Sequence, residues 1–213
     1  MALRYLNLEA LKASPLTREP FQYLVVPGFV RPEACSEINR DYPKIVESGS
    51  FPVAQLSYGP RFQEFLDEMA TDEFREAFEH KFGLDLNGRP HTITVRGHCS
   101  PKDGRIHTDT KSKIITILIY MNPEWENSGG RLRLLKSSSN LDDAIVEIPP
   151  AAGTLLAFKR SENSWHGHKP FSGERRVIQF NWVTSEGDRR MAMLRHHVSA
   201  SFKRLFGREQ PVA

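Results

Sequence analysis

A histidine and an aspartate two positions apart, His107 and Asp109, are the residues of this chain best placed to bind a metal ion together. In a β-strand, residues i and i+2 point to the same face, so an imidazole nitrogen and a carboxylate oxygen can hold one ion. A second imidazole from a distant strand, such as that of His166, would complete a face of three ligands. The opposite coordination positions would stay open. Such an arrangement suits non-haem Fe(II) and its chemistry with oxygen.

Arg176 lies ten residues after His166 and supplies a different kind of group. Its guanidinium is a planar fork that can bind a carboxylate bidentately, which is what an anchored oxo-acid co-substrate needs. The strand face that carries Arg176 also carries apolar residues: Ile178, Phe180 and Trp182. The opposite face is more polar and carries Arg175, Val177, Gln179 and Asn181. We therefore expect Arg176 to face the interior of the fold, where an unpaired charge would need an anion, and Arg175 to point outward.

The length of 213 residues predicts one domain over 1–213, and the elements that must position these residues change along it. Residues 1–90 predict a mostly helical support with one early strand, and 91–185 predict a β core. Residues 186–213 predict a C-terminal amphipathic helix. Many short strands separated by Gly, Pro and Asn turns favour a jelly-roll core over alternating βαβ units. The expected fold class is mainly β with flanking helices.

Local signals refine this outline. Pro32 is suited to the first position of a helix that runs toward Tyr42. Thr71 can cap a second helix, which Gly83 can terminate. The segment KIITILIY, residues 113–120, is apolar on both faces and predicts a central strand covered on both sides.

The order of the core motifs resembles that of the Fe(II)/2-oxoglutarate-dependent dioxygenases, in their prolyl-hydroxylase-like branch. The motifs are H-x-D, then YMNPEW followed by SGGRLRL, then P-x-x-G-x-L-x-x-F, and finally H-x9-R, and they cover residues 91–184. The resemblance implies a double-stranded β-helix core in which iron is held by His107, Asp109 and His166. It also implies that Arg176 binds the distal carboxylate of 2-oxoglutarate, with help from the hydroxyl of Tyr120.

Two positions near these motifs leave alternatives. The segment Trp165-His166-Gly167-His168 offers two imidazoles on one strand face, and periodicity does not choose between them. The family spacing to the arginine favours His166, which leaves His168 to support the metal ligands, to face the substrate or to be exposed. In the segment VRGHCS, where relatives often carry a tyrosine, Arg96 and His98 are the candidates for that place.

The implied activity is hydroxylation of an unactivated carbon, coupled to conversion of 2-oxoglutarate and O2 into succinate and CO2. Ascorbate is a further candidate cofactor. The presence of Asp109 favours hydroxylation over halogenation, because related halogenases lack this carboxylate. The expected substrate is a small metabolite or amino-acid derivative, and the alternative is a peptidyl, prolyl-type residue.

Two other classes of protein remain as alternatives. A cupin-like metal-dependent hydrolase or isomerase could use the same ligands, but it would leave Arg176 and Tyr120 without a role. A non-catalytic jelly-roll binding module would leave the whole ligand set unexplained.

Composition limits the partners and the compartment. The net charge of +3 and the lack of an arginine-rich run give no sign of nucleic-acid binding. Cys35 and Cys99 follow no metal or disulfide spacing, so we expect reduced thiols and the cytoplasm. We expect neither a signal peptide nor a membrane span. The basic amphipathic tail is expected to pack on its own domain or on a second copy in a homodimer.

Overall fold

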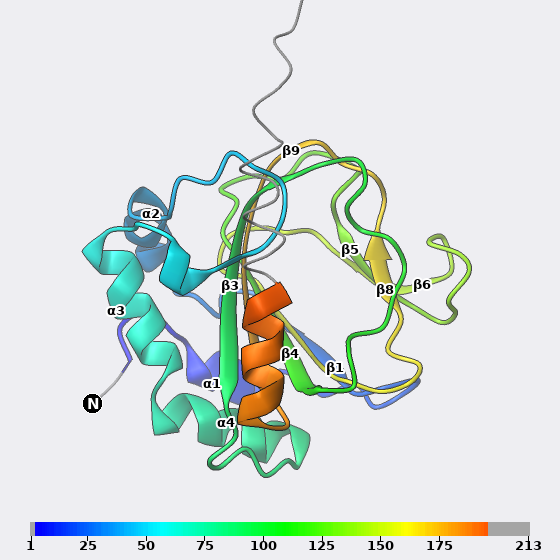
Figure 1. Ribbon diagram of the computed structural model, residues 1–213, viewed down its shortest axis with the longest axis horizontal. Helices are drawn as coiled ribbons and strands as arrows, with labels where there is room; N and C mark the ends of the chain where they lie inside the picture. The colour runs from blue at the N-terminus through cyan, green and yellow to red at the C-terminus, as the bar shows by residue number, and fades with distance from the viewer. Residues whose placement is uncertain (1–2, 196–213) are drawn as a thin grey trace, which may run out of the picture.

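Six antiparallel strands form the main sheet of the computed structural model, which describes residues 3–195. Their order across the sheet is β1-β7-β4-β9-β3-β2 (Figure 1). The bounds are β1 Tyr23–Val26, β2 Phe51–Pro52, β3 His91–Cys99, β4 Lys113–Tyr120, β7 Leu155–Lys159 and β9 Gly173–Val183. Both faces of the central strands β4 and β9 are covered, because one face packs with the helices and the other with the small sheet, as the apolar run in 113–120 predicts.

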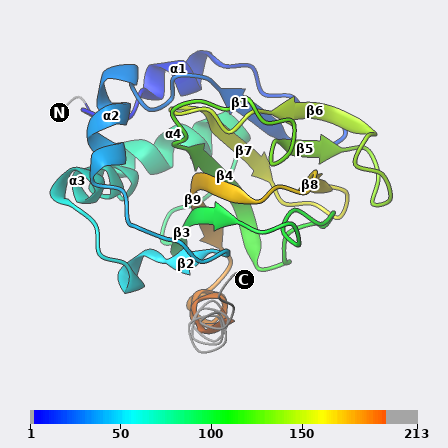
Figure 2. The ribbon, with the colours of Figure 1, turned by 90° about the horizontal axis from the view of Figure 1, so that it is seen from above.

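A smaller sheet of three strands, in the order β6-β5-β8, packs against one face of the main sheet (Figure 2). Its strands are β5 Leu132–Leu135, β6 Ala144–Ile148 and β8 His166–His168. Side chains of both sheets share one apolar cluster, for example Leu134 from the small sheet and Phe158 from the main one. Two antiparallel sheets packed in this way form the predicted jelly-roll core.

The helices cover the other face of the main sheet (Figures 1 and 2). They are α1 Leu8–Ala13, α2 Pro32–Arg40, α3 Pro60–Met69 and α4 Asp72–Phe82, with a short 3-10 helix at Val53–Gln55. The capping predictions are confirmed for α4: the Thr71 hydroxyl accepts a hydrogen bond from the Phe74 amide at 3.3 Å. Gly83 ends α4 in the left-handed conformation, with φ of +63°.

The central strand β9 therefore faces two different environments. Its outer face packs on the helical layer, where the Phe74 ring of α4 lies 5.4 Å from Phe180 and 5.7 Å from Trp182, centroid to centroid. Its inner face points toward the small sheet, where Val177 joins the apolar cluster that the two sheets share. The more apolar face of β9 is thus the one that meets the helices.

The C-terminal prediction falls partly outside the described residues. Residues 186–195 are helical, and Met191 and Leu194 on this helix are 51% and 56% exposed. The rest of the predicted helix, 196–213, lies beyond the described part of the chain. Among the described helices, none combines the length and the apolar character that crossing a membrane requires.

Candidate metal centre

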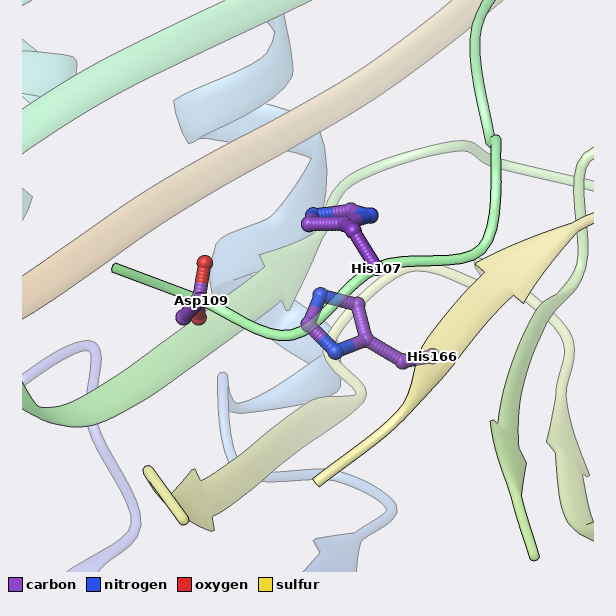
Figure 3. Close-up of side chains that lie close together, drawn as sticks. All are labelled: His107, Asp109 and His166. Carbon is purple, nitrogen blue, oxygen red and sulfur yellow. The ribbon is translucent and has the colours of Figure 1, made fainter. Parts of the chain in front are cut away.

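The side chains of His107, Asp109 and His166 lie close together, the first two on the loop between β3 and β4 and the third on β8 (Figure 3). Each offers one ligand atom, and these three atoms all lie within 4.8 Å of one another. The backbone fixes the two histidines opposite each other. His107 N–H donates to His166 O, and His166 N–H donates to His107 O, each at 3.0 Å. A short antiparallel bridge therefore brings together residues that are distant in the sequence.

The hydrogen bonds of the two imidazoles leave the same nitrogen free on each ring. Nδ1 of His107 lies 2.8 Å from Arg105 O, and Nδ1 of His166 lies 3.0 Å from Ser164 O. Because a carbonyl oxygen can only accept, each Nδ1 carries the proton and donates it. The lone pair on each Nε2 is then available to a metal ion. The hydrogen bond from Nδ1 to a backbone carbonyl holds each ring in orientation.

Asp109 is buried, and both of its oxygens are engaged. Lys113 Nζ lies 2.7 Å from Oδ1, and the Thr116 hydroxyl donates to Oδ2 at 2.6 Å. Burial alone would raise the pKa of Asp109, but the Lys113 ammonium, His166 and the two hydrogen bonds hold it well below its usual value. Burial lowers the pKa of His166 to about 4, against the opposing effect of the Asp109 carboxylate. One ionised carboxylate and a neutral imidazole are the protonation states that metal binding requires.

His168 does not belong to this three-residue cluster, although it lies on the same short strand as His166. It packs against the loop before His107, and its amide donates to Gly104 O at 2.9 Å. Gly104 has φ of +83°, and a Cβ there would lie 2.4 Å from His168 Nδ1. Glycine is therefore required where this loop passes the His168 ring.

The cluster opens into a cavity of about 210 Å³. The cavity is lined by Ser50, Arg96, Gly104, His107, Asp109, Lys113, Thr116, Leu118, Leu132, His166, Gly167, His168, Arg175, Val177 and Gln179. A larger cavity, of about 970 Å³, lies between the N-terminal segment and α4 and contains none of these residues.

The expected orientation of the two adjacent arginines is wrong. Arg175 is 5% exposed and lines the cavity, and its Nε donates to Gly130 O at 2.8 Å. Arg176 points to the helical side instead, where its Nη1 donates to Asn39 Oδ1 at 3.1 Å. The more apolar face of β9 does not line the interior of the jelly roll, because it packs on the helices. The more polar face lines the cavity.

Tyr120 lies inside the apolar cluster that the two sheets share, next to Arg175. The Arg175 guanidinium carbon is 5.6 Å from the centre of the Tyr120 ring. The Tyr120 hydroxyl is buried and makes no hydrogen bond in the described structure. Burial raises the pKa of Tyr120 to about 12, opposed by the charge of Arg175, so the hydroxyl keeps its proton and can donate it.

Of the two candidates on β3, the structure places Arg96 at the cavity, while His98 is not among the lining residues. Arg96 Nη1 pairs with Asp103 at 3.0 Å, and its Nη2 lies 3.3 Å from the Ser50 hydroxyl. A register shift in the pairing of β3 with β9 between residues 96 and 98 accompanies this change of direction.

Sequence reasoning missed Lys113 and Thr116, which hold the Asp109 carboxylate. Their positions depend on the turn after Asp109, in which Lys113 N–H donates to Thr110 O at 3.0 Å and the chain reverses into β4. The available signal was the lysine four residues after the aspartate, at the start of an apolar strand.

Comparison with known proteins agrees with this geometry. Residues 95–184 match the family model of the 2OG-Fe(II) oxygenase superfamily. Over these residues, the chain is similar to the 2OG-Fe(II) oxygenase superfamily. Its class is that of an Fe(II)- and 2-oxoglutarate-dependent dioxygenase, and Fe(II), 2-oxoglutarate and O2 are the cofactors that this class implies. The curated proteins include no significant match to the sequence.

Solved structures of prolyl hydroxylases share the fold of this oxygenase. A prolyl-4-hydroxylase from Pseudomonas putida is similar over 87% of this chain and 98% of its own, with a TM-score of 0.55 and 17% identity. One from Phytophthora capsici is similar over 77% of this chain and 59% of its own, with a TM-score of 0.53 and 17% identity. The viral collagen prolyl hydroxylase of Paramecium Bursaria Chlorella virus-1, as a 2OG complex, covers 76% of this chain and 96% of its own at 17% identity, with a TM-score of 0.50.

The residues present fit these cofactors. Two imidazole nitrogens and one carboxylate oxygen on one side of an open cavity form a donor set suited to Fe(II). In the described part of the chain, no carboxylate pairs with the buried Arg175, and the Tyr120 hydroxyl near it lacks a partner. These two groups fit one carboxylate of a 2-oxo dicarboxylic acid.

Proposed function

We propose that the oxygenase hydroxylates an unactivated carbon of a small metabolite or amino-acid-type substrate while it converts 2-oxoglutarate and O2 into succinate and CO2. In this proposal His107, Asp109 and His166 are the iron ligands, and Arg175 binds the distal carboxylate of 2-oxoglutarate. The observation that carries it is Arg175, a buried cation without a carboxylate partner among the described residues, in the same cavity as the ligand cluster.

Each residue has a role that follows from its contacts. The two imidazoles bind through Nε2, because their Nδ1 protons are held by backbone carbonyls. Asp109 supplies the negative charge, and Lys113 and Thr116 keep its carboxylate in one orientation. When bound, the iron supplies the oxygen chemistry, and the protein supplies ligands, orientation and a shielded cavity.

Arg175 suits an anchoring role because its charge is desolvated and its direction is fixed. The guanidinium uses Nε on the Gly130 carbonyl, which leaves both terminal nitrogens for a bidentate contact. The Tyr120 hydroxyl can donate one more hydrogen bond to the same carboxylate. An anion at this position would satisfy two buried groups at once.

A peptidyl, prolyl-type hydroxylase is the second candidate, favoured by the prolyl hydroxylases that share the fold. For the compartment we propose the cytoplasm, on the basis of the two free cysteines, Cys35 and Cys99. Ascorbate dependence and a homodimer through the C-terminal helix stay predictions.

Anaerobic titration with Fe(II) and then 2-oxoglutarate tests the proposal. Chelation of a 2-oxo acid to Fe(II) at this site should give a visible metal-to-ligand charge-transfer band, and oxygen should then produce succinate. If the protein binds Fe(II) but shows no band on addition of 2-oxoglutarate, the proposal is contradicted. That result would support the alternative of a cupin-like metal-dependent hydrolase or isomerase.

A further inference from the structure

The charges that line the active-site cavity are unequal. Its lining contains three cations, Arg96, Lys113 and Arg175, and one carboxylate, Asp109. Arg96 is balanced by Asp103, which lies 3.0 Å away. The remaining two cations face a single carboxylate, so one positive charge is in excess in the described cavity.

Cofactor binding does not remove this excess, if the proposed function holds. The two positive charges of Fe(II) and the two negative charges of 2-oxoglutarate cancel each other. Arg175 then pairs with the co-substrate. The single negative charge of Asp109 is shared between the iron and the Lys113 ammonium. The excess positive charge is therefore left beside the metal, at Lys113. A partly enclosed positive site of this kind attracts an anion.

Lys113 also has unused hydrogen-bonding capacity. An ammonium has three N–H donors, and the described structure gives Lys113 one acceptor, Asp109 Oδ1 at 2.7 Å. The side chain is only 19% exposed, and it lines the cavity rather than the outer surface. Its remaining donors are thus available next to the ligand cluster.

We infer that the prime substrate carries a carboxylate that pairs with Lys113. This inference rests on the proposed function and names the substrate class for it. Because Lys113 contacts a proposed iron ligand directly, a carboxylate bound there places its neighbouring carbons close to the metal. An internal residue of a peptide has no backbone carboxylate to offer. The charge therefore favours a small free acid, such as an amino-acid derivative, over a peptidyl prolyl residue.

A pair of probes that differ in one charge tests the inference. N-acetyl-L-proline is an anion, and N-acetyl-L-prolinamide is its neutral analogue of nearly the same shape. Each is titrated into the anaerobic protein loaded with Fe(II) and 2-oxoglutarate, by calorimetry and by the shift of the charge-transfer band. We expect the acid to bind at least about tenfold more tightly than the amide, a difference of about 1.4 kcal/mol.

Variants assign the preference to one side chain. Lys113→Met should lose the preference for the acid, and Lys113→Arg should keep most of it. Lys111→Met is the matched control, because Lys111 is 82% exposed and its Nζ lies 3.6 Å from Glu162. This control should bind both probes like the wild type. The band itself shows in each variant that the iron and 2-oxoglutarate are in place.

Several results would overturn the inference. Equal binding of acid and amide to the wild type, or no saturable binding of the acid, would do so, as would a preference that survives in Lys113→Met. If Lys113→Met instead raises the 2-oxoglutarate requirement and leaves the acid-to-amide ratio unchanged, the ammonium serves the co-substrate and the inference is wrong. A wild-type protein without the band would be a different failure, that of the proposed function.

Discussion

Replacing Arg175 by methionine should raise the 2-oxoglutarate concentration needed for half-saturation by at least about a hundredfold. Removing one partner of a buried, charged, hydrogen-bonded pair costs about 2–5 kcal/mol. At about 1.4 kcal/mol per factor of ten, even the middle of this range exceeds a hundredfold. The upper part of this range applies to Arg175, because its side chain is only 5% exposed and it lines the active-site cavity. Methionine keeps an unbranched apolar stem beside Tyr120.

The adjacent arginine provides the matched control. Arg176→Met removes the same charge one residue along β9, but its guanidinium contacts Asn39 on the helical side and its side chain is 27% exposed. We expect its half-saturating 2-oxoglutarate concentration to stay within about threefold of the wild type, because a factor of three is only about 0.7 kcal/mol.

The assay is an anaerobic titration of the Fe(II)-loaded protein with 2-oxoglutarate, followed through the charge-transfer band. Thermal unfolding checks that each variant is folded, since the lost hydrogen bond from Arg175 to Gly130 O contributes about 1 kcal/mol to stability. A larger effect for Arg176→Met than for Arg175→Met would show that the register of β9 is wrong. Small and equal effects of both variants on the half-saturating 2-oxoglutarate concentration would show that neither arginine binds 2-oxoglutarate.

Three further predictions concern the cluster and its surroundings. His166→Ala should lose the charge-transfer band, while His168→Ala should keep it; the reverse pattern in the same titration would exclude His166 as the distal ligand. Thr116→Val should weaken Fe(II) binding about 10- to 100-fold, because it removes the hydrogen bond that orients Asp109. The control, Thr94→Val, changes a buried threonine of β3 that the structure does not connect to the cluster, and equal Fe(II) affinities of the two variants in a competition assay would refute the orienting role. Tyr120→Phe should raise the 2-oxoglutarate requirement about tenfold, the worth of one hydrogen bond, and an unchanged titration curve would place the co-substrate elsewhere.

The ligand cluster could be predicted in part from local geometry alone. The i, i+2 spacing of His107 and Asp109 fixes their shared direction in any extended segment. His166 needed long-range information, because its approach to His107 depends on a backbone bridge between distant segments. The spacing of family motifs supplied that information, and periodicity could not, since it treats His166 and His168 alike.

The residues around the carboxylate could not be predicted in the same way. Lys113 reaches Asp109 because the chain turns at residues 110–112 and then enters β4. Thr116 reaches the same carboxylate from further along that strand. A period of two describes the strand but contains no information on how the turn folds back on it. Contacts across a turn of this kind depend on its three-dimensional path.

The two arginines of β9 point opposite to the expected directions for a physical reason. The pattern of β9 does show one apolar and one polar face, but apolarity marks the face that meets the helical layer. The interior of the jelly roll has to bind charged cofactors, so it carries Arg175 and Gln179 at the cavity and Asn181 close by. Burying such groups is unfavourable unless they have partners. On a central strand covered on both sides, the buried face that carries polar residues is therefore the one that lines the active site. Buried polar residues depart from the apolar pattern of an ordinary core strand, and this departure indicates the site.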